Sequence, residues 1–456
     1  MFNHLSVVWD KVRTGLWPVP ISMILLAGPL YAAASWADGM VSDAEGLRTW
    51  WLHSGSGDDA RNLLSTLVAA IITMSTLVFS ITIVTLSLAA NQFGSRLIRT
   101  YMTDMRTKLA LGVFTMTIVY CLLALRSVEK DMPPGVVPHV VVTLGLVLGV
   151  CCVLTLLFFL HVVARSIMAD EVIRRVADEL EASVEQLPPL QQRRSEPDPA
   201  QVLPHDFDAR LTILASKQEG YVQAVEHARL VELASKHDVV VRLEMRPGTF
   251  MCKDGWLAHV YPAEAVTPDF VEAFQEGFLI GTRRTPTQDL EFPIRHLVDI
   301  ALRALSPGIN DPNTAMVVID YLRAALSRLM GKCLPPAIHL DKAGRARLID
   351  KPNGYDDILA AALQQIRQSA AGHPDVIITL LRAIGRIGEH VRLPEQRDAL
   401  LHQARMTADG GLRDLAEPSD RADVERNLAA VTRKLDQVLR RKPQVASPAP
   451  PASACI

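Results

Sequence analysis

The chain of 456 residues carries 47 lysines and arginines against 49 aspartates and glutamates, which gives a formal net charge of −2. A chain this close to neutrality offers no overall electrostatic basis for binding nucleic acid, so we expect none as a partner. Hydrophobic residues make up 49% of the chain. They concentrate in long uncharged runs in its first third, whereas the remainder has the composition of a soluble protein.

Four apolar runs in this first third have the length and composition of membrane-spanning helices, so the lipid bilayer is an expected partner. The first run is bordered by tryptophans and contains prolines, which favours a retained helix over a cleaved signal peptide. The predicted transmembrane domain covers residues 1–165, with helices at 17–36, 62–91, 109–125 and 139–163.

The distribution of charge predicts the orientation of these helices. Segment 37–61 carries five acidic residues against two arginines, whereas segment 91–108 carries four lysines and arginines against one aspartate. Because positively charged loops stay in the cytoplasm, we expect the first segment outside and the second inside. Both termini are then cytoplasmic.

Hydroxyl side chains recur every seven residues along the second predicted span, so they share one stripe of a helix. Such a stripe is of no use to a helix facing lipid, and we expect it to face protein or water. One hypothesis is a wet pore enclosed by several copies. The other is a dry helix–helix contact, where serine and threonine are common. The pore-lining candidates are Thr66, Thr73, Thr76, Ser80, Ser87 and Asn91.

The leading functional hypothesis is a homo-oligomeric channel or permeation protein for an ion or small molecule, with a cytoplasmic gating or sensing region. The four predicted spans contain no charged residue, which argues against an ion-coupled pump. The sign of a permeant ion stays open, because Asp58 and Asp59 attract cations at one end while Arg96 and Arg99 attract anions at the other. The alternative is a membrane-anchored cytoplasmic ligand-binding sensor or scaffold without transport.

The remaining chain predicts a cytoplasmic α+β unit and a mainly α-helical region. Segment 166–205 combines an amphipathic helix at 169–186 with a proline-rich linker. A small α+β domain follows at 206–265, with strands at 210–215, 220–225, 239–243 and 256–261 and a helix at 227–237. From Pro268 the pattern is helical, giving a helical domain at 266–440 and a disordered tail at 441–456.

Segment 289–315 predicts a helix, a tight turn and a second helix. Arg295, Asp299 and Arg303 recur every four residues and form a charge ladder on one helix face. Asp311 precedes Pro312, as a capping residue precedes proline in the first turn of a helix. These residues either only fold, or gather polar atoms for a ligand or a neighbouring subunit. The candidates are Arg295, His296, Asp299, Arg303, Asn310, Asp311, Asn313 and Thr314.

Motifs of known enzymes are missing from the sequence. We find no G-x-S-x-G, H-E-x-x-H, Walker-type or G-x-G-x-x-G pattern. None of the six cysteines forms a C-x-x-C pair, and we expect all of them to be reduced. The sequence therefore predicts no enzyme activity, no catalytic residue, no metal site and no cofactor.

Two strings, VFSITIVTLSLAANQFGSR and LVDIALRALSPGINDPNTA, resemble a bacterial family of predicted membrane proteins catalogued as domain of unknown function twenty-two fifty-four. The resemblance extends to about residue 430. It implies an integral inner-membrane protein with a cytoplasmic C-terminal half, and it brings no established activity. A weaker similarity, in VVVRLEMRPGTFMCKDGWLAHVYP, is to half of a lipoyl- or biotinyl-type hammerhead. Lys253 lacks the flanking methionines of those domains, so we expect no covalent cofactor.

Overall fold

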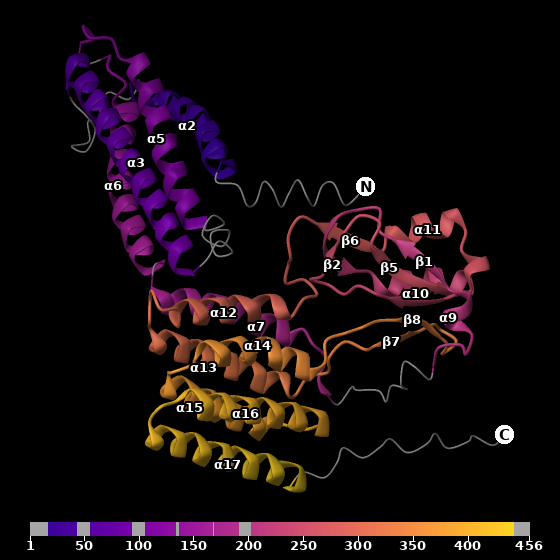
Figure 1. Ribbon diagram of the computed structural model, residues 1–456. Helices are drawn as coiled ribbons and strands as arrows, with labels where there is room; N and C mark the ends of the chain where they lie inside the picture. Colours follow the sequence, from indigo (N-terminus) through magenta and orange to yellow (C-terminus); the bar gives the residue numbers. More distant parts are fainter. Residues whose placement is uncertain are drawn as a thin grey trace, which may run out of the picture. The chain divides into compact units, whose positions relative to one another are not determined.

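A computed structural model of the chain describes residues 17–42, 55–93, 105–133, 136–166, 168–190 and 202–441 (Figure 1). The chain divides into two compact units, Met1–Val172 and Ile173–Ile456. Buried apolar side chains form separate clusters in each unit, so each has its own hydrophobic core. Arg96, Arg99 and the tail at 442–456 lie outside the described residues.

Four long helices make up most of the described part of the first unit. Within that part, they are the helices long and apolar enough to cross a membrane. Each predicted span corresponds to one of them, and each helix continues past the predicted C-terminal end. The helices are α2 (Pro18–Ser42), α3 (Gly57–Phe93), α5 (Met105–Ser127) and α6 (His139–Ser166).

Glycines allow α6 to pack closely against α3. A Cβ atom added at Gly149 would lie 2.9 Å from Leu67 Cδ2, and one at Gly145 would lie 3.1 Å from Leu64 Cδ2. At these distances the two leucines must shift before a larger side chain fits. Small residues therefore set the distance between these two helices, as is common in membrane bundles.

Polar contacts at the start of α6 tie it to α2 and α5. The carboxylate of Asp38, on α2, accepts hydrogen bonds from the amides of Val140 and Val141 at 2.7 and 3.0 Å. These are two of the amides that a helix start leaves without an internal partner. The hydroxyl of the buried Tyr120, on α5, donates to Val141 O at 2.9 Å.

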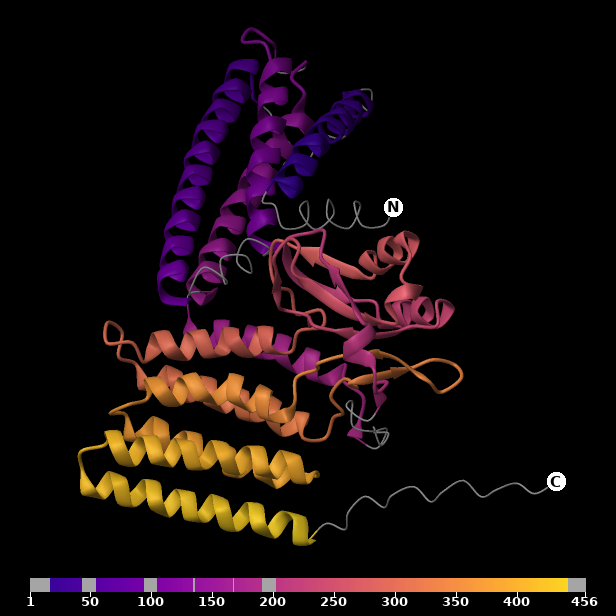
Figure 2. The same cartoon turned by 45° about the vertical axis from the view of Figure 1, so that its right-hand side comes forward.

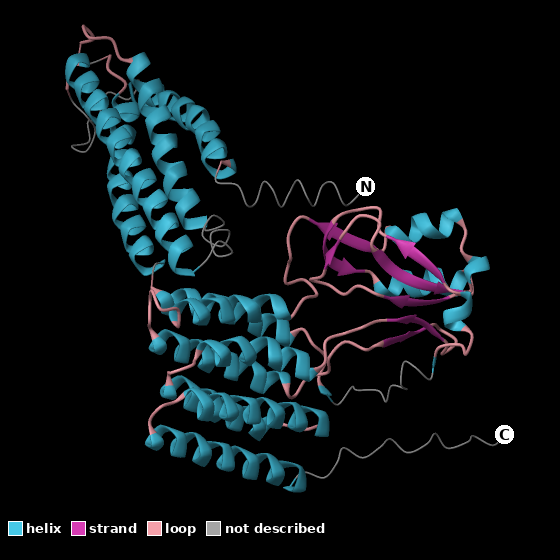
Figure 3. Ribbon diagram, viewed as in Figure 1, coloured by secondary structure: helices cyan, strands magenta, loops and turns pink. Residues whose placement is uncertain are grey.

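The second unit places its strands in one region and its long helices in another (Figure 3). A five-stranded sheet has the order β1-β5-β3-β8-β7, and a three-stranded sheet has the order β4-β2-β6. Helices α9 (Phe207–Arg210), α10 (His227–Lys236) and α11 (Pro268–Gln275) accompany them. The strands are β1 (Thr212–Ala215), β2 (Gly220–Val225), β3 (Val240–Leu243), β4 (Phe250–Met251), β5 (Trp256–Tyr261), β6 (Phe278–Gly281), β7 (Ile338–Leu340) and β8 (Ala346–Ile349).

Three short strands, β6, β7 and β8, interrupt the helical pattern predicted after Pro268. Strand β8 pairs in parallel with β3, with Val241 opposite Leu348. These strands have three or four residues each, too few for a periodic pattern to identify them. The strand predicted at 210–215 also begins later, because residues up to Arg210 form α9.

Helices of the second unit stack in layers, as the two views in Figures 1 and 2 show. Backbone hydrogen bonds tie the segment after α7 to the segment after α13, from Leu190 N to Gly331 O at 2.9 Å and from Cys333 N to Pro188 O at 2.7 Å. The helices are α7 (Ala169–Glu185), α12 (Glu291–Ala304), α13 (Pro312–Leu329), α14 (Tyr355–Ser369), α15 (Pro374–Ile387), α16 (Pro394–Asp414) and α17 (Pro418–Arg441).

Candidate functional site

The hydroxyl stripe predicted on the second span lies on the face of α3 opposite its packed face. Thr66, Thr73, Thr76, Ser80 and Ser87 are exposed, and the side chain of Asn91 lies outside the described residues. The buried positions of α3 include Leu64, Ile71 and Val78, about half a helical turn away from the stripe. Within the described part of the chain, the stripe is therefore not a contact with the protein's own helices.

A neighbouring row of hydroxyl groups faces the interior of the first unit instead. Ser75 and Thr82 are buried, and their hydroxyls donate to Ile71 O and Val78 O at 2.8 and 2.7 Å. Their donors are thus satisfied within the same helix, as is common for serine and threonine in apolar surroundings. The two rows, adjacent in sequence, have opposite environments.

Three further residues share the exposed face with the hydroxyl stripe. Ala70, Leu77 and Val84 follow a stripe residue by four positions and precede the next by three, and all three are exposed. Alternating steps of four and three residues form the heptad spacing of a helix–helix contact. We define the α3 seam as Thr66, Ala70, Thr73, Leu77, Ser80, Val84 and Ser87.

The threonine hydroxyls on this face donate hydrogen bonds within α3, which leaves only their oxygen lone pairs for other groups. Thr66, Thr73 and Thr76 donate to the carbonyl oxygens of Asn62, Ala69 and Ile72 at 2.8, 2.9 and 3.0 Å. Because each hydroxyl proton is used inside the helix, the group offers its surroundings an acceptor oxygen rather than a donor. These threonines therefore present electron pairs along an exposed face.

The predicted turn and helix cap at Asp311 are confirmed. Asp311 Oδ1 accepts from Thr314 N at 3.1 Å, and its Oδ2 accepts from Thr314 Oγ1 at 2.6 Å. The hydrogen bonds from the Thr314 hydroxyl and backbone lower the pKa of Asp311. Asn310 has a φ of 51°, a left-handed conformation that asparagine tolerates better than most residues. Asn313 is exposed.

The other candidates from this segment lie on α12, before the turn. Arg295 Nε donates to Glu291 Oε2 at 2.9 Å, so the ladder of Arg295, Asp299 and Arg303 begins one turn earlier than predicted. The buried ring of His296 packs against Phe292 with centroids 4.4 Å apart. Eight residues, or about 12 Å of helix, separate His296 from the last residue of α12. The eight candidates therefore do not converge on one point.

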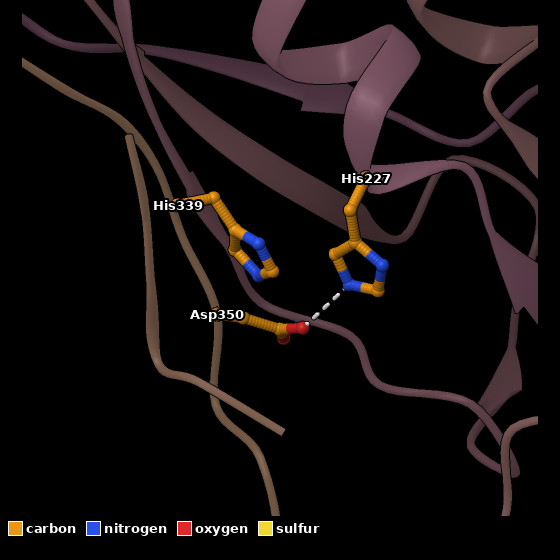
Figure 4. A group of neighbouring side chains, drawn as sticks. All are labelled: His227, His339 and Asp350. Atoms are coloured by element: carbon orange, nitrogen blue, oxygen red, sulfur yellow. Dashed lines mark hydrogen bonds and ion pairs between the residues drawn. The ribbon is translucent and has the colours of Figure 1, made fainter. Parts of the chain in front are cut away.

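The structure brings together three residues that the sequence analysis did not single out. His227 is the first residue of α10, His339 lies in β7, and Asp350 follows β8. His227 Nε2 and Asp350 Oδ2 are 2.9 Å apart, and the two imidazole rings stack with centroids 4.5 Å apart (Figure 4). One nitrogen or oxygen atom from each residue lies within 4.8 Å of the others.

His227 and His339 line a cavity of about 1990 Å³ in the second unit. Burial, followed by the neighbouring His227, lowers the pKa of His339. Its imidazole is therefore neutral at neutral pH and has a nitrogen lone pair. The expectation of no metal site rested on cysteine spacing, which does not test such a histidine and aspartate group. Because 123 residues separate His227 from Asp350, no local spacing could have revealed it.

Comparison with known proteins places the chain in a family. A model for a predicted membrane protein, DUF2254, matches residues 13–386. An uncharacterized protein of Mycobacterium bovis is 30% identical over 450 residues, which cover 96% of this chain and 84% of the relative. Two uncharacterized proteins of Mycobacterium tuberculosis strains are 30% and 29% identical with the same coverage. No solved structure matches. The chain therefore belongs to the DUF2254 family of predicted membrane proteins.

Proposed function

We propose that this membrane protein assembles from several copies through the α3 seam and that the copies together border a path for passive permeation. One observation carries the proposal: small and apolar residues recur at heptad spacing on an exposed face of an apolar helix. Small residues favour association of membrane helices because they let two backbones approach closely. Placement in the inner membrane, with both termini in the cytoplasm, is part of the proposal.

The seam has two rows with different chemistry, which suits two different neighbours. Ala70, Leu77 and Val84 form an apolar row that packs against the next copy. The second row, Thr66, Thr73, Ser80 and Ser87, borders the path. In such a ring each helix meets its neighbour along one edge and faces the central axis along the other.

Acceptor oxygens on the path favour a cation or a neutral polar solute over an anion. The threonine hydroxyls at 66 and 73 already donate inside the helix, so they cannot donate to an anion as well. Asp58 and Asp59 add negative charge in the first turn of α3. We therefore propose cations as the preferred ions.

A membrane-anchored ligand sensor is the second candidate, favoured by the cavity of about 1990 Å³ in the second unit. The cavity is lined by residues from several elements, including α10, β7 and α16. A site assembled in this way couples ligand binding to the arrangement of those elements. A sensing role explains the large size of the second unit. The unit either acts as a sensor by itself or serves as the gating region of the permeation protein.

Disulfide cross-linking tests the assembly. In a cysteine-free full-length background, Ser80→Cys tests the seam, and Phe79→Cys is the control. Phe79 is also exposed but points about 100° away around the helix. We expect oxidation in membranes to cross-link Ser80→Cys in preference to Phe79→Cys. Equal cross-linking of both, or none at Ser80, contradicts assembly through the seam.

Ion flux tests permeation separately. Potassium flux into vesicles containing the purified protein should fall when Ser80→Leu replaces a hydroxyl on the path. The same flux should persist with Phe79→Leu, because that residue lies off the seam. Cross-linking at Ser80 combined with flux no different from protein-free vesicles would retain the assembly and reject the channel.

A further inference from the structure

We propose that His227, His339 and Asp350 bind a divalent transition-metal ion of the zinc class. The inference goes beyond permeation and depends on nothing in the first unit. Two imidazoles and one carboxylate are ligands that such ions prefer. Three protein ligands with a further position open to water or a small ligand are typical of zinc sites that do more than stabilise a fold.

Antiparallel pairing of β7 with β8 brings two of these ligands near each other. Ile338 lies opposite Ile349, and Asp350 N donates to Ala337 O at 2.7 Å. Asp350, the residue after β8, is therefore opposite Ala337, and His339 lies two residues farther along the chain, on the same face of the pair. The third ligand, His227, starts a helix whose contacts include both strands. Separate elements thus support the three ligands.

The carboxylate of Asp350 is held in a defined orientation. Its Oδ1 accepts the amide proton of Lys351 at 2.7 Å, while Oδ2 faces His227. The residue is only 8% exposed. Because Oδ1 is held in this way, the carboxylate loses little conformational freedom when Oδ2 binds a metal.

Distances within the group suit a metal after small side-chain shifts. Tetrahedral bonds of about 2.0–2.1 Å hold ligand atoms about 3.4 Å apart. The distance from His227 Nε2 to Asp350 Oδ2 is 2.9 Å, and all three ligand atoms lie within 4.8 Å of one another. Each atom needs to move by less than about 1 Å to reach a tetrahedral arrangement, and the two imidazoles need to turn toward a common point.

A metal-free explanation accounts for only two of the three residues. The hydrogen bond between His227 and Asp350 links α10 to the β7–β8 hairpin without any ion. It does not account for His339 Nε2, which is a buried atom with no hydrogen-bond partner among the described residues. Buried polar atoms are rarely left in that state, and such an atom calls for an unseen partner. A metal ion supplies one.

The surroundings of the group also favour a cation. Charged residues lining the cavity comprise five acids and two bases, an excess of three negative charges. This excess attracts a cation to the opening on which His227 and His339 lie. The charged lining residues are Glu232, Asp341, Asp356, Glu395, Asp398, Lys342 and Arg345.

Metal titration of the purified full-length protein tests the proposal. After removal of bound metal with a chelator, Zn²⁺ should bind with one equivalent per chain and raise the melting temperature. His339→Ala and His227→Gln should each weaken Zn²⁺ binding at least about 100-fold, since loss of an outer partner alone costs about 10–100-fold. His402→Ala is the matched control, because His402 lines the same cavity outside the group and should leave the affinity unchanged.

Cobalt provides a second readout that identifies the ligands. Co²⁺ in the stripped protein should give the visible absorption of a nitrogen- and oxygen-ligated ion, without the charge-transfer band of a thiolate ligand. If His339→Ala fails to fold, His227→Gln decides, because glutamine keeps a hydrogen-bonding side chain beside Asp350. Unchanged Zn²⁺ affinity in the folded variants, or a thiolate band with Co²⁺, overturns the proposal.

Discussion

Replacing Asp311 by alanine should loosen the first turn of α13 without affecting distant helices. The change removes the acceptors of two hydrogen bonds from Thr314, 3.1 and 2.6 Å long. Loss of a helix cap costs about 1 kcal/mol, or about five-fold in an equilibrium constant. Asp311→Asn keeps an acceptor oxygen at the same place and is the matched control.

Hydrogen exchange measured by mass spectrometry on the full-length protein is the appropriate assay. Amides in the first turn of α13 should exchange about five-fold faster in Asp311→Ala and within two-fold of wild type in Asp311→Asn. Peptides from α17 should not change. Wild-type exchange in Asp311→Ala would refute the capping account. Fast exchange in both variants would show that the negative charge matters rather than the cap.

The capped carboxylate also predicts how the helix start responds to pH. Hydrogen bonds from Thr314 lower the pKa of Asp311 in the folded protein. The stabilising contribution is therefore fully present above the unfolded pKa of about 3.9 and is lost as the pH falls through the lower folded value. First-turn exchange should accelerate over that acidic range in wild type, after correction for intrinsic exchange, and Asp311→Asn should lack this dependence.

Three further predictions concern packing and charge. Gly149→Leu should crowd Leu67, cost about 1–3 kcal/mol of stability and lower the melting temperature in detergent. Gly28→Leu should leave the melting temperature unchanged, because open space surrounds Gly28. An equal fall in both variants would contradict the close packing at Gly149. Asp38→Ala should speed amide exchange at the start of α6 by removing the acceptor of two amides, with wild-type rates counting against the cap. A backbone amide of its own turn and a buried guanidinium lower the pKa of Asp341 to about 2. The stability that Asp341 gives the β7–β8 hairpin should therefore be lost as the pH falls from about 4 to about 2, and amide exchange in the hairpin should accelerate over that range. Asp341→Asn should lack this acceleration, and a pH profile identical to wild type would contradict the prediction.

Features written in a continuous stretch of sequence were predictable. Uncharged length located the four long helices, because a helix satisfies its backbone groups within one segment. The dipeptide Asp311-Pro312 located a helix start, since both residues act within a single turn. The seven-residue spacing on α3 likewise placed the stripe residues on one face, and the structure shows that this face is exposed.

Features that depend on distant segments were not predictable. Strand β8 has four residues and finds its partner β3 about a hundred positions earlier in the chain. The same pairing, together with β7, brings His339 and Asp350 to His227. Without knowledge of the sheet, these histidines look like isolated residues. A local pattern cannot report a site whose members meet only through tertiary pairing.

A map of the protein in a lipid bilayer decides whether copies assemble through the α3 seam, because it shows what the exposed face of α3 contacts. We expect a symmetric assembly in which Leu77 and Val84 pack against a neighbouring copy while Thr73 and Ser80 face a common axis. A single copy surrounded by lipid, or an assembly with α3 on its outer rim and these hydroxyls against acyl chains, would contradict it.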